Sequence, residues 1–161
     1  MTLPNRKPNR LPHFDYSHYG AYFITICTKD KLCTLGRIQQ GDIFHRASCL
    51  LTPTGKLVAQ QIQEMEHHYS HIYIDKYVIM PNHIHMILFI SENTFSSSPA
   101  NSVIPSFVST FKRFTNKKAD TNLWQRSYHD HIIRNDVDYS LIWKYIDNNP
   151  EKWAEDCFYS P

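Results

Sequence analysis

Apolar stretches with strand-like or helix-like spacing follow one another along the chain. Residues 19–28 (YGAYFITICT) are rich in aromatic and β-branched residues, which is typical of a strand near the centre of a sheet. Two later apolar stretches meet at Pro81 and Asn82, where the chain must turn. The pattern predicts strands at 19–28, 71–80, 83–91 and 128–134, with a weaker pair within 33–48 around Gly36 and Gly41.

Three other stretches repeat apolar residues every three or four positions, as one face of a helix requires. Val58, Ile62 and Met65 form such a face in the first stretch. The predicted helices run from a cap at Thr52 or Thr54 to about Tyr69, over 104–118, and from a cap at Asn135 or Asp136 to the residue before Pro150.

The order of these elements is strand, strand, helix, strand, strand, helix, strand, helix. It predicts an α+β protein, a ferredoxin-like sandwich whose central antiparallel β-sheet is covered by α-helices on one face. At 161 residues and 42% hydrophobic, the chain can build one packed core. We expect a single domain over 1–161, with a basic N-terminal arm (1–18) and a flexible, serine-rich loop (91–102).

Composition indicates the cellular compartment and the state of the cysteines. The chain has no run of about 18 apolar residues, and its basic N-terminus lacks the apolar segment of a secretory signal, so we expect a soluble, intracellular protein without membrane contact. The spacing of Cys27, Cys33, Cys49 and Cys157 fits neither a zinc-binding pair nor a disulfide scaffold. These cysteines are expected to be reduced and to lie mostly in the core.

Positive charge is concentrated in two stretches, although the net charge is only +2. Both stretches are candidates for contacts with nucleic-acid phosphates, and solvated surface charge is the alternative explanation for each. Aromatic residues such as Phe14, Tyr16 and Trp124 are available for base stacking. The candidate phosphate contacts are Arg6, Lys7 and Arg10 in the arm, and Lys112, Arg113, Lys117, Lys118 and Arg126 in the second stretch.

The stretch YVIMPNHIHMIL places two imidazoles, His83 and His85, within an apolar strand. Alternate residues of a strand point the same way, with Cα atoms about 6.5 Å apart, so both rings can reach one metal ion. The alternative is a pair on the sheet surface that makes ordinary hydrogen bonds. Because YHDHIIR holds a second such pair, His129 and His131, spacing alone does not choose between them.

The last predicted helix carries a further constellation in KYIDNNP. Tyr145 and Asn149 are four residues apart and therefore share one face of the helix. The Asn149 amide oxygen is a neutral, hard ligand, and the Tyr145 phenol would lie near the same ion. Alternatively, Tyr145 is a core aromatic residue and Asn149 only ends the helix before Pro150.

Together, YVIMPNHIHMIL, WQRSYHDHIIR and KYIDNNP resemble the single-tyrosine transposases of the HUH superfamily, and in particular the REP-associated tyrosine transposases (RAYT). The opening RLPHFDYSHYGAYFITICT is also similar to that group. The resemblance implies a ferredoxin-like fold, a divalent metal (Mg²⁺ or Mn²⁺) bound by His83, His85 and Asn149, and Tyr145 as the nucleophile. It leaves His129 and His131 outside the metal site, while Tyr128 is the competing tyrosine.

The resemblance implies a metal-dependent endonuclease and strand transferase for single-stranded DNA. It would act on REP-type hairpins through a covalent 5′-phosphotyrosine intermediate, near the nucleoid in the bacterial cytoplasm. The alternatives are a hairpin-DNA-binding protein without catalysis, a hydrolase in which water attacks, and a zinc-structured interaction domain. Whether the protein is a monomer or a homodimer, and whether Tyr145 acts on its own histidines or on those of a partner chain, is left open.

Overall fold

A computed structural model describes residues 20–91 and 103–159 of the protein. The predicted N-terminal arm, with Arg6, Lys7, Arg10, Phe14 and Tyr16, lies outside the described residues. So does the predicted loop apart from Ser91.

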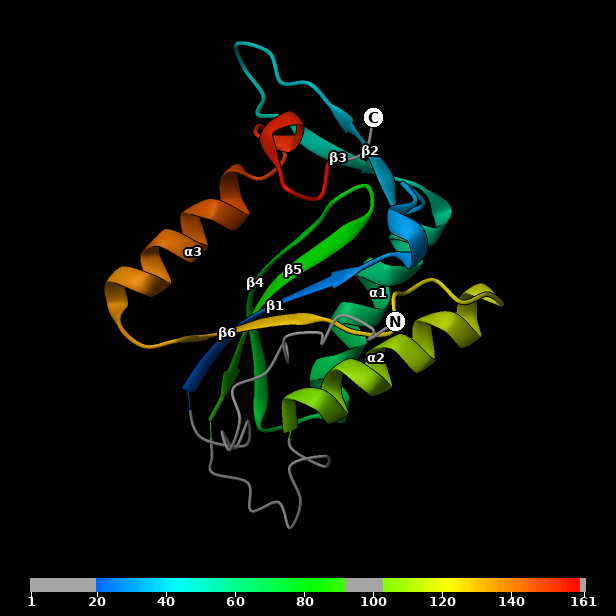
Figure 1. Ribbon diagram of the computed structural model, residues 1–161, viewed down its shortest axis with the longest axis vertical. Coiled ribbons are helices and arrows are strands. Elements are labelled where there is room, and N and C mark those ends of the chain that lie inside the picture. The colour runs from blue at the N-terminus through cyan, green and yellow to red at the C-terminus, as the bar shows by residue number, and fades with distance from the viewer. Residues whose placement is uncertain (1–19, 92–102, 160–161) are drawn as a thin grey trace, which may run out of the picture.

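A four-stranded antiparallel sheet forms the centre of the structure (Figure 1). Its strands lie in the order β4-β5-β1-β6, so β5 and β1 are central and β6 is an edge. The prediction of these four strands is confirmed to within one residue at each end. Their bounds are Gly20–Cys27 (β1), Ile72–Ile79 (β4), His83–Ile90 (β5) and His129–Ile133 (β6).

The three predicted helices are also present, and side-chain caps explain where the first and the third begin. The helices are α1 (Pro53–His68), α2 (Val103–Ala119) and α3 (Asp136–Asn148). The Thr52 hydroxyl accepts the backbone N–H of Gly55 (3.1 Å), and the Asn135 side chain accepts that of Asp138 (2.9 Å). Each cap satisfies a donor that the first helical turn leaves free.

The sheet separates the core from the candidate site. On β5, Ile84, Met86 and Leu88 face α1 and α2 and belong to the main hydrophobic cluster. The side chains of His83 and His85 alternate with them and point to the other face, where α3 crosses the sheet (Figure 1). The helices therefore cover both faces, and the expectation of helices on one face holds only for α1 and α2.

The connectivity β1-α1-β4-β5-α2-β6 is the β-α-β-β-α-β arrangement of a ferredoxin-like fold, so the predicted fold class is confirmed. A separate hairpin, β2 (Gly36–Gln39) and β3 (Ser48–Leu51), is inserted between β1 and α1. The second strand of this pair begins only at the end of the stretch in which the sequence predicts it.

The cysteines differ from their prediction. None of the four forms a disulfide, but only Cys27 is buried, while Cys33 and Cys157 are exposed. The expectation that they lie mostly in the core is therefore wrong. Within the described ranges, 20–91 and 103–159, there is no helix with the length and apolar character needed to span a bilayer.

Candidate active site

The pair His83 and His85 lies on the central strand β5, opposite Cys27 and Thr25 of β1. Both side chains are fully buried, with exposed fractions of 0% and 1%, and their ring centroids are 4.4 Å apart. Because β5 is a central strand of the sheet, the stretch around the two polar rings is apolar and the rings themselves are enclosed. It also gives each ring a fixed backbone and little room to turn.

Asn82 fixes the ring of His83. The Asn82 Nδ2 group donates to the backbone oxygens of Phe158 (2.8 Å) and Lys31 (3.2 Å), which leaves its Oδ1 facing Nδ1 of His83 at 2.9 Å. Since an amide oxygen only accepts, the proton of His83 must be on Nδ1. The lone pair on Nε2 is therefore available for a metal ion.

Thr25 holds His85 in a similar way. Its Oγ1 lies within hydrogen-bond distance (2.7 Å) of Nδ1 of His85, and in the tautomer that leaves Nε2 free for a metal ion Nδ1 donates and Oγ1 accepts. Burial lowers the pKa of His83 to about 4, opposed by the Asp156 carboxylate. Burial, followed by the neighbouring His83, lowers the pKa of His85 well below its usual value. Both imidazoles are therefore neutral at pH 7, as coordination requires.

Tyr145 lies on α3 directly above His85 of the same chain. Its hydroxyl is 3.4 Å from Nε2 of His85 and donates a hydrogen bond to Oδ2 of Asp156 (3.1 Å). Its ring packs against His85 and, edge-on, against Phe23. Burial, followed by the charge of Asp156, raises the pKa of Tyr145, so the phenol is protonated at neutral pH.

Asn149 completes this side of the site at the C-terminal cap of α3. Its Nδ2 donates to Oδ2 of Asp156 (2.7 Å), which turns Oδ1 the other way. Oδ1 of Asn149 and Nε2 of His83 are both buried and have no hydrogen-bond partner within residues 20–91 and 103–159. A buried acceptor without a donor is costly, and a cation would satisfy both atoms.

Asp156 is the site residue that the sequence did not reveal. One ligand atom from each of His83, His85 and Asp156 lies within 4.8 Å of the others, so the three residues could hold a metal ion. Imidazole nitrogens and carboxylate oxygens are ordinary ligands of divalent metals. An isolated aspartate in AEDCF carries no spacing signal, and only the fold brings it to the histidines.

The C-terminal segment, residues 150–159, carries Asp156 and covers the histidine pair. The ring of Phe158 lies 4.8 Å from that of His83, and its backbone oxygen accepts from Asn82. Trp153, in the short 3-10 helix Trp153–Glu155, lies 6.0 Å from the His83 ring. These contacts shield the inner side of the site from water.

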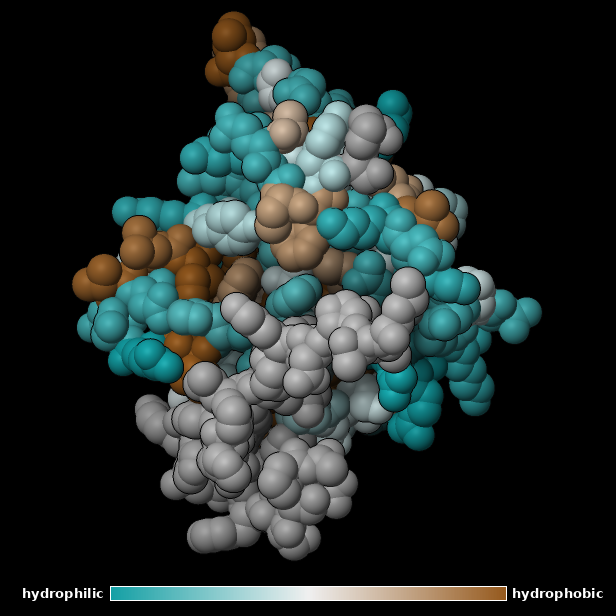
Figure 2. All heavy atoms as spheres, viewed as in Figure 1, coloured by the Kyte–Doolittle hydropathy of each residue, from teal (hydrophilic) through white to brown (hydrophobic). Residues whose placement is uncertain are grey.

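The outer side of Tyr145 is open. The Tyr145 side chain is 41% exposed and lines a cavity of about 380 Å³ together with Lys144 and Lys152, both of which are exposed. The neighbouring surface of α3 is apolar, because Leu141 and Val137 are exposed one and two turns before Tyr145 (Figure 2). The two lysines are candidate anion contacts that the sequence does not reveal, because they stand apart from the two basic stretches.

The second histidine pair has a different environment. His131 Nε2 lies 2.8 Å from Oδ2 of Asp138 on α3, and His129 is exposed on the edge strand β6. The competing tyrosine, Tyr128, is buried in the main hydrophobic cluster, with an exposed fraction of 7%. Neither His131 nor Tyr128 offers the free ligand or the open hydroxyl that a reaction centre needs.

The basic residues of α2 lie on a helix that packs on the opposite face of the sheet from His83 and His85. Lys112 donates to the backbone oxygens of Gln125 (2.8 Å) and Ser127 (2.9 Å), and Lys118 pairs with Glu64. Burial lowers the pKa of Lys112 to about 8. Arg113, Lys117 and Arg126 are exposed. Phosphate binding by these five residues stays a prediction.

The prediction that Trp124 is available for base stacking is wrong. Trp124 is 3% exposed, and its indole N–H donates to Oγ1 of Thr115 (2.7 Å) within the core. A base cannot reach a ring that is enclosed in this way.

Two buried imidazoles on a ferredoxin-like sheet, faced by a tyrosine one helical turn from an amide, form the arrangement expected of a single-tyrosine transposase of the HUH class. The chain belongs to the IS200-like transposase family, whose sequence model ("Transposase IS200 like") matches residues 44–149. Membership in this family makes it a DNA-processing enzyme.

Similar proteins agree with this assignment. An uncharacterised protein of Haemophilus influenzae is 33% identical, over 98% of this chain and 94% of its own. A second protein of that organism, named "Putative REP-associated tyrosine transposase", is 24% identical over 86% of this chain and 74% of its own. A solved structure of a REP-associated tyrosine transposase bound to a REP hairpin shares the fold, with a TM-score of 0.59 and 20% identity, covering 94% of this chain and 74% of that one.

Proposed function

We propose that the protein is a metal-dependent endonuclease and strand transferase for single-stranded DNA, which acts on REP-type hairpins through a covalent 5′-phosphotyrosine intermediate. The position of the Tyr145 hydroxyl carries this proposal. It lies 3.4 Å from Nε2 of His85 and hydrogen-bonds to the carboxylate of Asp156. A phosphodiester that enters from the open side of Tyr145 would meet a hydroxyl nucleophile next to the atoms that could bind a metal ion.

The residues of the site fit a divalent cation. His83, His85 and Asn149 would bind it, with Asp156 as a carboxylate ligand, and the partnerless atoms of His83 and Asn149 support this set. The family resemblance favours Mg²⁺ or Mn²⁺, and the oxygen donors of Asn149 and Asp156 suit either ion. Such an ion would stabilise the negative charge that develops on the scissile phosphate.

In the proposed reaction the Tyr145 oxygen bonds to phosphorus while the bond to the 3′ oxygen of the preceding nucleotide breaks. The phenol proton passes to Asp156, which already accepts its hydrogen bond. The 3′ oxygen leaves with the bonding electrons and takes a proton from water to become a 3′-hydroxyl. Because the phosphoester bond to Tyr145 is retained, another 3′-hydroxyl can attack it and join strands without a further energy source.

The DNA partner follows from the family and from the charges near the site. Lys144 and Lys152 flank the cavity beside Tyr145 and would hold backbone phosphates, as would Arg6, Lys7 and Arg10 of the arm. The related structure contains a REP hairpin, which supports a hairpin as the substrate. Chromosomal hairpins would place the protein at the nucleoid in the bacterial cytoplasm.

The test is covalent capture of DNA. Wild-type protein incubated with hairpin-bearing single-stranded DNA and Mg²⁺ or Mn²⁺ should give an adduct that survives a denaturing gel. Tyr145→Phe should give none while still binding the hairpin, because only the nucleophilic oxygen is removed. Tyr128→Phe is the matched control, since it removes the hydroxyl of the buried competing tyrosine.

The other outcomes separate the alternatives. Cleavage by Tyr145→Phe without an adduct would mean that water attacks, and the protein would be a hydrolase. Hairpin binding by the wild type without any adduct, whichever divalent metal is supplied, would leave a DNA-binding protein without catalysis.

A further inference from the structure

Helix α3 carries both Tyr145 and Asn149, yet apolar packing does little to fix its position. Ile146 is the only buried residue within its span, Asp136–Asn148, whereas α1 and α2 bury five and six residues. Apolar burial is the main source of stability for a docked helix in a globular protein. The alignment of α3 over the sheet therefore depends also on its aromatic and polar contacts, among them Tyr145 with His85 and Tyr139 with Asp75.

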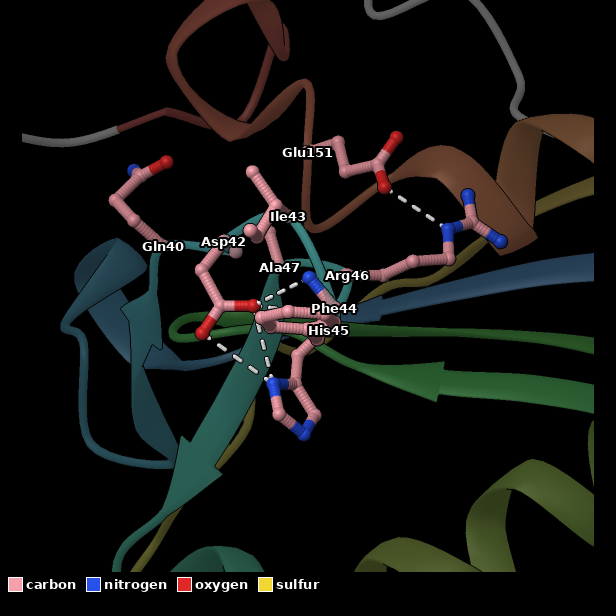
Figure 3. A pocket seen from close by; sticks show the side chains of 9 residues that line it. Gln40, Asp42, Ile43, Phe44, His45, Arg46, Ala47 and Glu151 are labelled. Atoms are coloured by element: carbon pink, nitrogen blue, oxygen red, sulfur yellow. Dashed lines mark hydrogen bonds and ion pairs between the residues drawn. The ribbon is translucent and has the colours of Figure 1, made fainter.

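A charged clamp provides several of the polar contacts, and we define it as Arg46, Lys76 and Asp147. Nη1 of Arg46 donates to Oδ2 of Asp147 (2.6 Å), and Nζ of Lys76 on β4 donates to Oδ1 (2.6 Å). Each oxygen of the α3 carboxylate thus has its own cation. Arg46 also donates from Nη2 to Oδ1 of Asn148 (2.6 Å) and from Nε to Oε1 of Glu151 (2.9 Å), the latter seen in Figure 3.

The segment that presents Arg46 is ordered by its own hydrogen bonds. Oδ1 of Asp42 accepts the backbone N–H groups of Phe44 (2.7 Å) and His45 (2.8 Å), which fixes the turn between β2 and β3 (Figure 3). Arg46 therefore reaches α3 from a preformed turn. A single exposed ion pair contributes little, but several charge-assisted bonds from one guanidinium also impose a defined geometry.

We propose that Arg46 is a positioning residue, which holds Tyr145 and Asn149 in line with His83 and His85 through its contacts with α3. The inference rests on the proposed function. Asp147 lies two residues from Tyr145 and two from Asn149, so these three residues span only about 6 Å of helix and must move together. A shift of about 1 Å in a reacting group can lower a rate by roughly a hundredfold.

A direct phosphate contact is the competing role for Arg46, because its side chain is 54% exposed. The two roles differ in kinetics. A phosphate contact acts on DNA affinity, whereas a positioning contact acts on the rate of the bound complex.

The first experiment measures adduct formation with hairpin-bearing single-stranded DNA under single-turnover conditions. Arg46→Ala should lower the maximal rate by about tenfold, with the half-saturating DNA concentration unchanged. Arg46→Lys should recover part of the rate, since one ammonium can replace only some of the bonds of the guanidinium fork. Arg37→Ala is the matched control, because Arg37 is an exposed arginine on strand β2 of the same hairpin. An unchanged rate, or a higher half-saturating concentration alone, overturns the proposal.

The second experiment needs no DNA and therefore remains decisive if the wild type forms no adduct. Hydrogen exchange of the full-length protein should show faster exchange of α3 amides in Arg46→Ala, with α1 and α2 unchanged. Unchanged protection of α3 would overturn the clamp whatever the fate of the proposed function. An adduct missing from the wild type, together with faster exchange of α3 in the variant, would count against the proposed function and leave the clamp in place.

Discussion

At the scale of single residues, the imidazoles of His83 and His85 are prepared for coordination by side chains outside the two-histidine motif. Asn82 fixes the tautomer of His83, and Thr25, sixty positions away in sequence, fixes His85. Spacing predicts that a two-histidine pair can bind a metal, but the pair at 129 and 131 has the same spacing. Burial and these partners are what distinguish the two pairs, and both arise from tertiary structure.

The assignment of Asp156 as a ligand can be tested without DNA. Asp156→Asn keeps the shape of the side chain but removes the charge, so the affinity for Mn²⁺ should fall by about tenfold or more, as measured by calorimetry or electron paramagnetic resonance. Glu155→Gln removes the same charge from an exposed neighbour that lines the same cavity. Equal Mn²⁺ affinity in Asp156→Asn and in the wild type would exclude Asp156 from the site.

At the scale of elements, the close approach of α1 to the segment before β2 links the core to the active-site strand. The backbone N–H of Thr52 donates to the backbone oxygen of Leu35 (3.0 Å), and the N–H of Leu35 donates to that of Pro81 (3.0 Å). Pro81 precedes Asn82 and His83, so the start of α1 is connected to the site through two hydrogen-bonded steps. Only a glycine at position 55 allows this approach, because a Cβ there would overlap the Leu35 carbonyl.

Gly55→Ala should therefore destabilise the protein, although alanine is the better helix former. The overlap with backbone costs about 1–3 kcal/mol, while the gain in helix propensity is about 1 kcal/mol. Urea unfolding should show a net loss of up to about 2 kcal/mol. Lys56→Ala, at the next and exposed position, is the control and should change the unfolding free energy by less than about 0.5 kcal/mol. A stabilised Gly55→Ala variant would mean that the backbone around Leu35 can move away from the added Cβ at little cost in free energy.

The elements themselves were predictable because their signals are local. Alternation in strands, the face carrying Val58, Ile62 and Met65, and the caps at Thr52 and Asn135 each depend on residues within one or two turns of one another. The C-terminal segment gave no such signal. Its residues reach the site through Asp156 and Phe158, which lie beside the histidines of β5, far away in the chain.

At the scale of the whole molecule, the two faces of the sheet have different roles. The face with α1 and α2 holds the core, and the face with α3 and the C-terminal segment holds the candidate site. The sequence predicts the sheet and the helices but not that α3 crosses to the opposite face, because this depends on contacts such as Lys76 with Asp147 and Tyr139 with Asp75. These contacts bring Tyr145 to the histidines of its own chain.

This arrangement makes a prediction about mixed variants. Tyr145→Phe lacks the nucleophile and His83→Ala lacks a ligand, so each alone should form no adduct with hairpin DNA. If α3 serves its own sheet, a mixture of the two should also form none, even where the chains associate. Wild type diluted with Tyr145→Phe is the control and should give adduct in proportion to the wild-type fraction. An adduct from the mixture of the two inactive variants would require α3 to reach the histidines of a partner, and the contacts of Asp147 and Tyr139 with their own sheet would then have to break and re-form between chains.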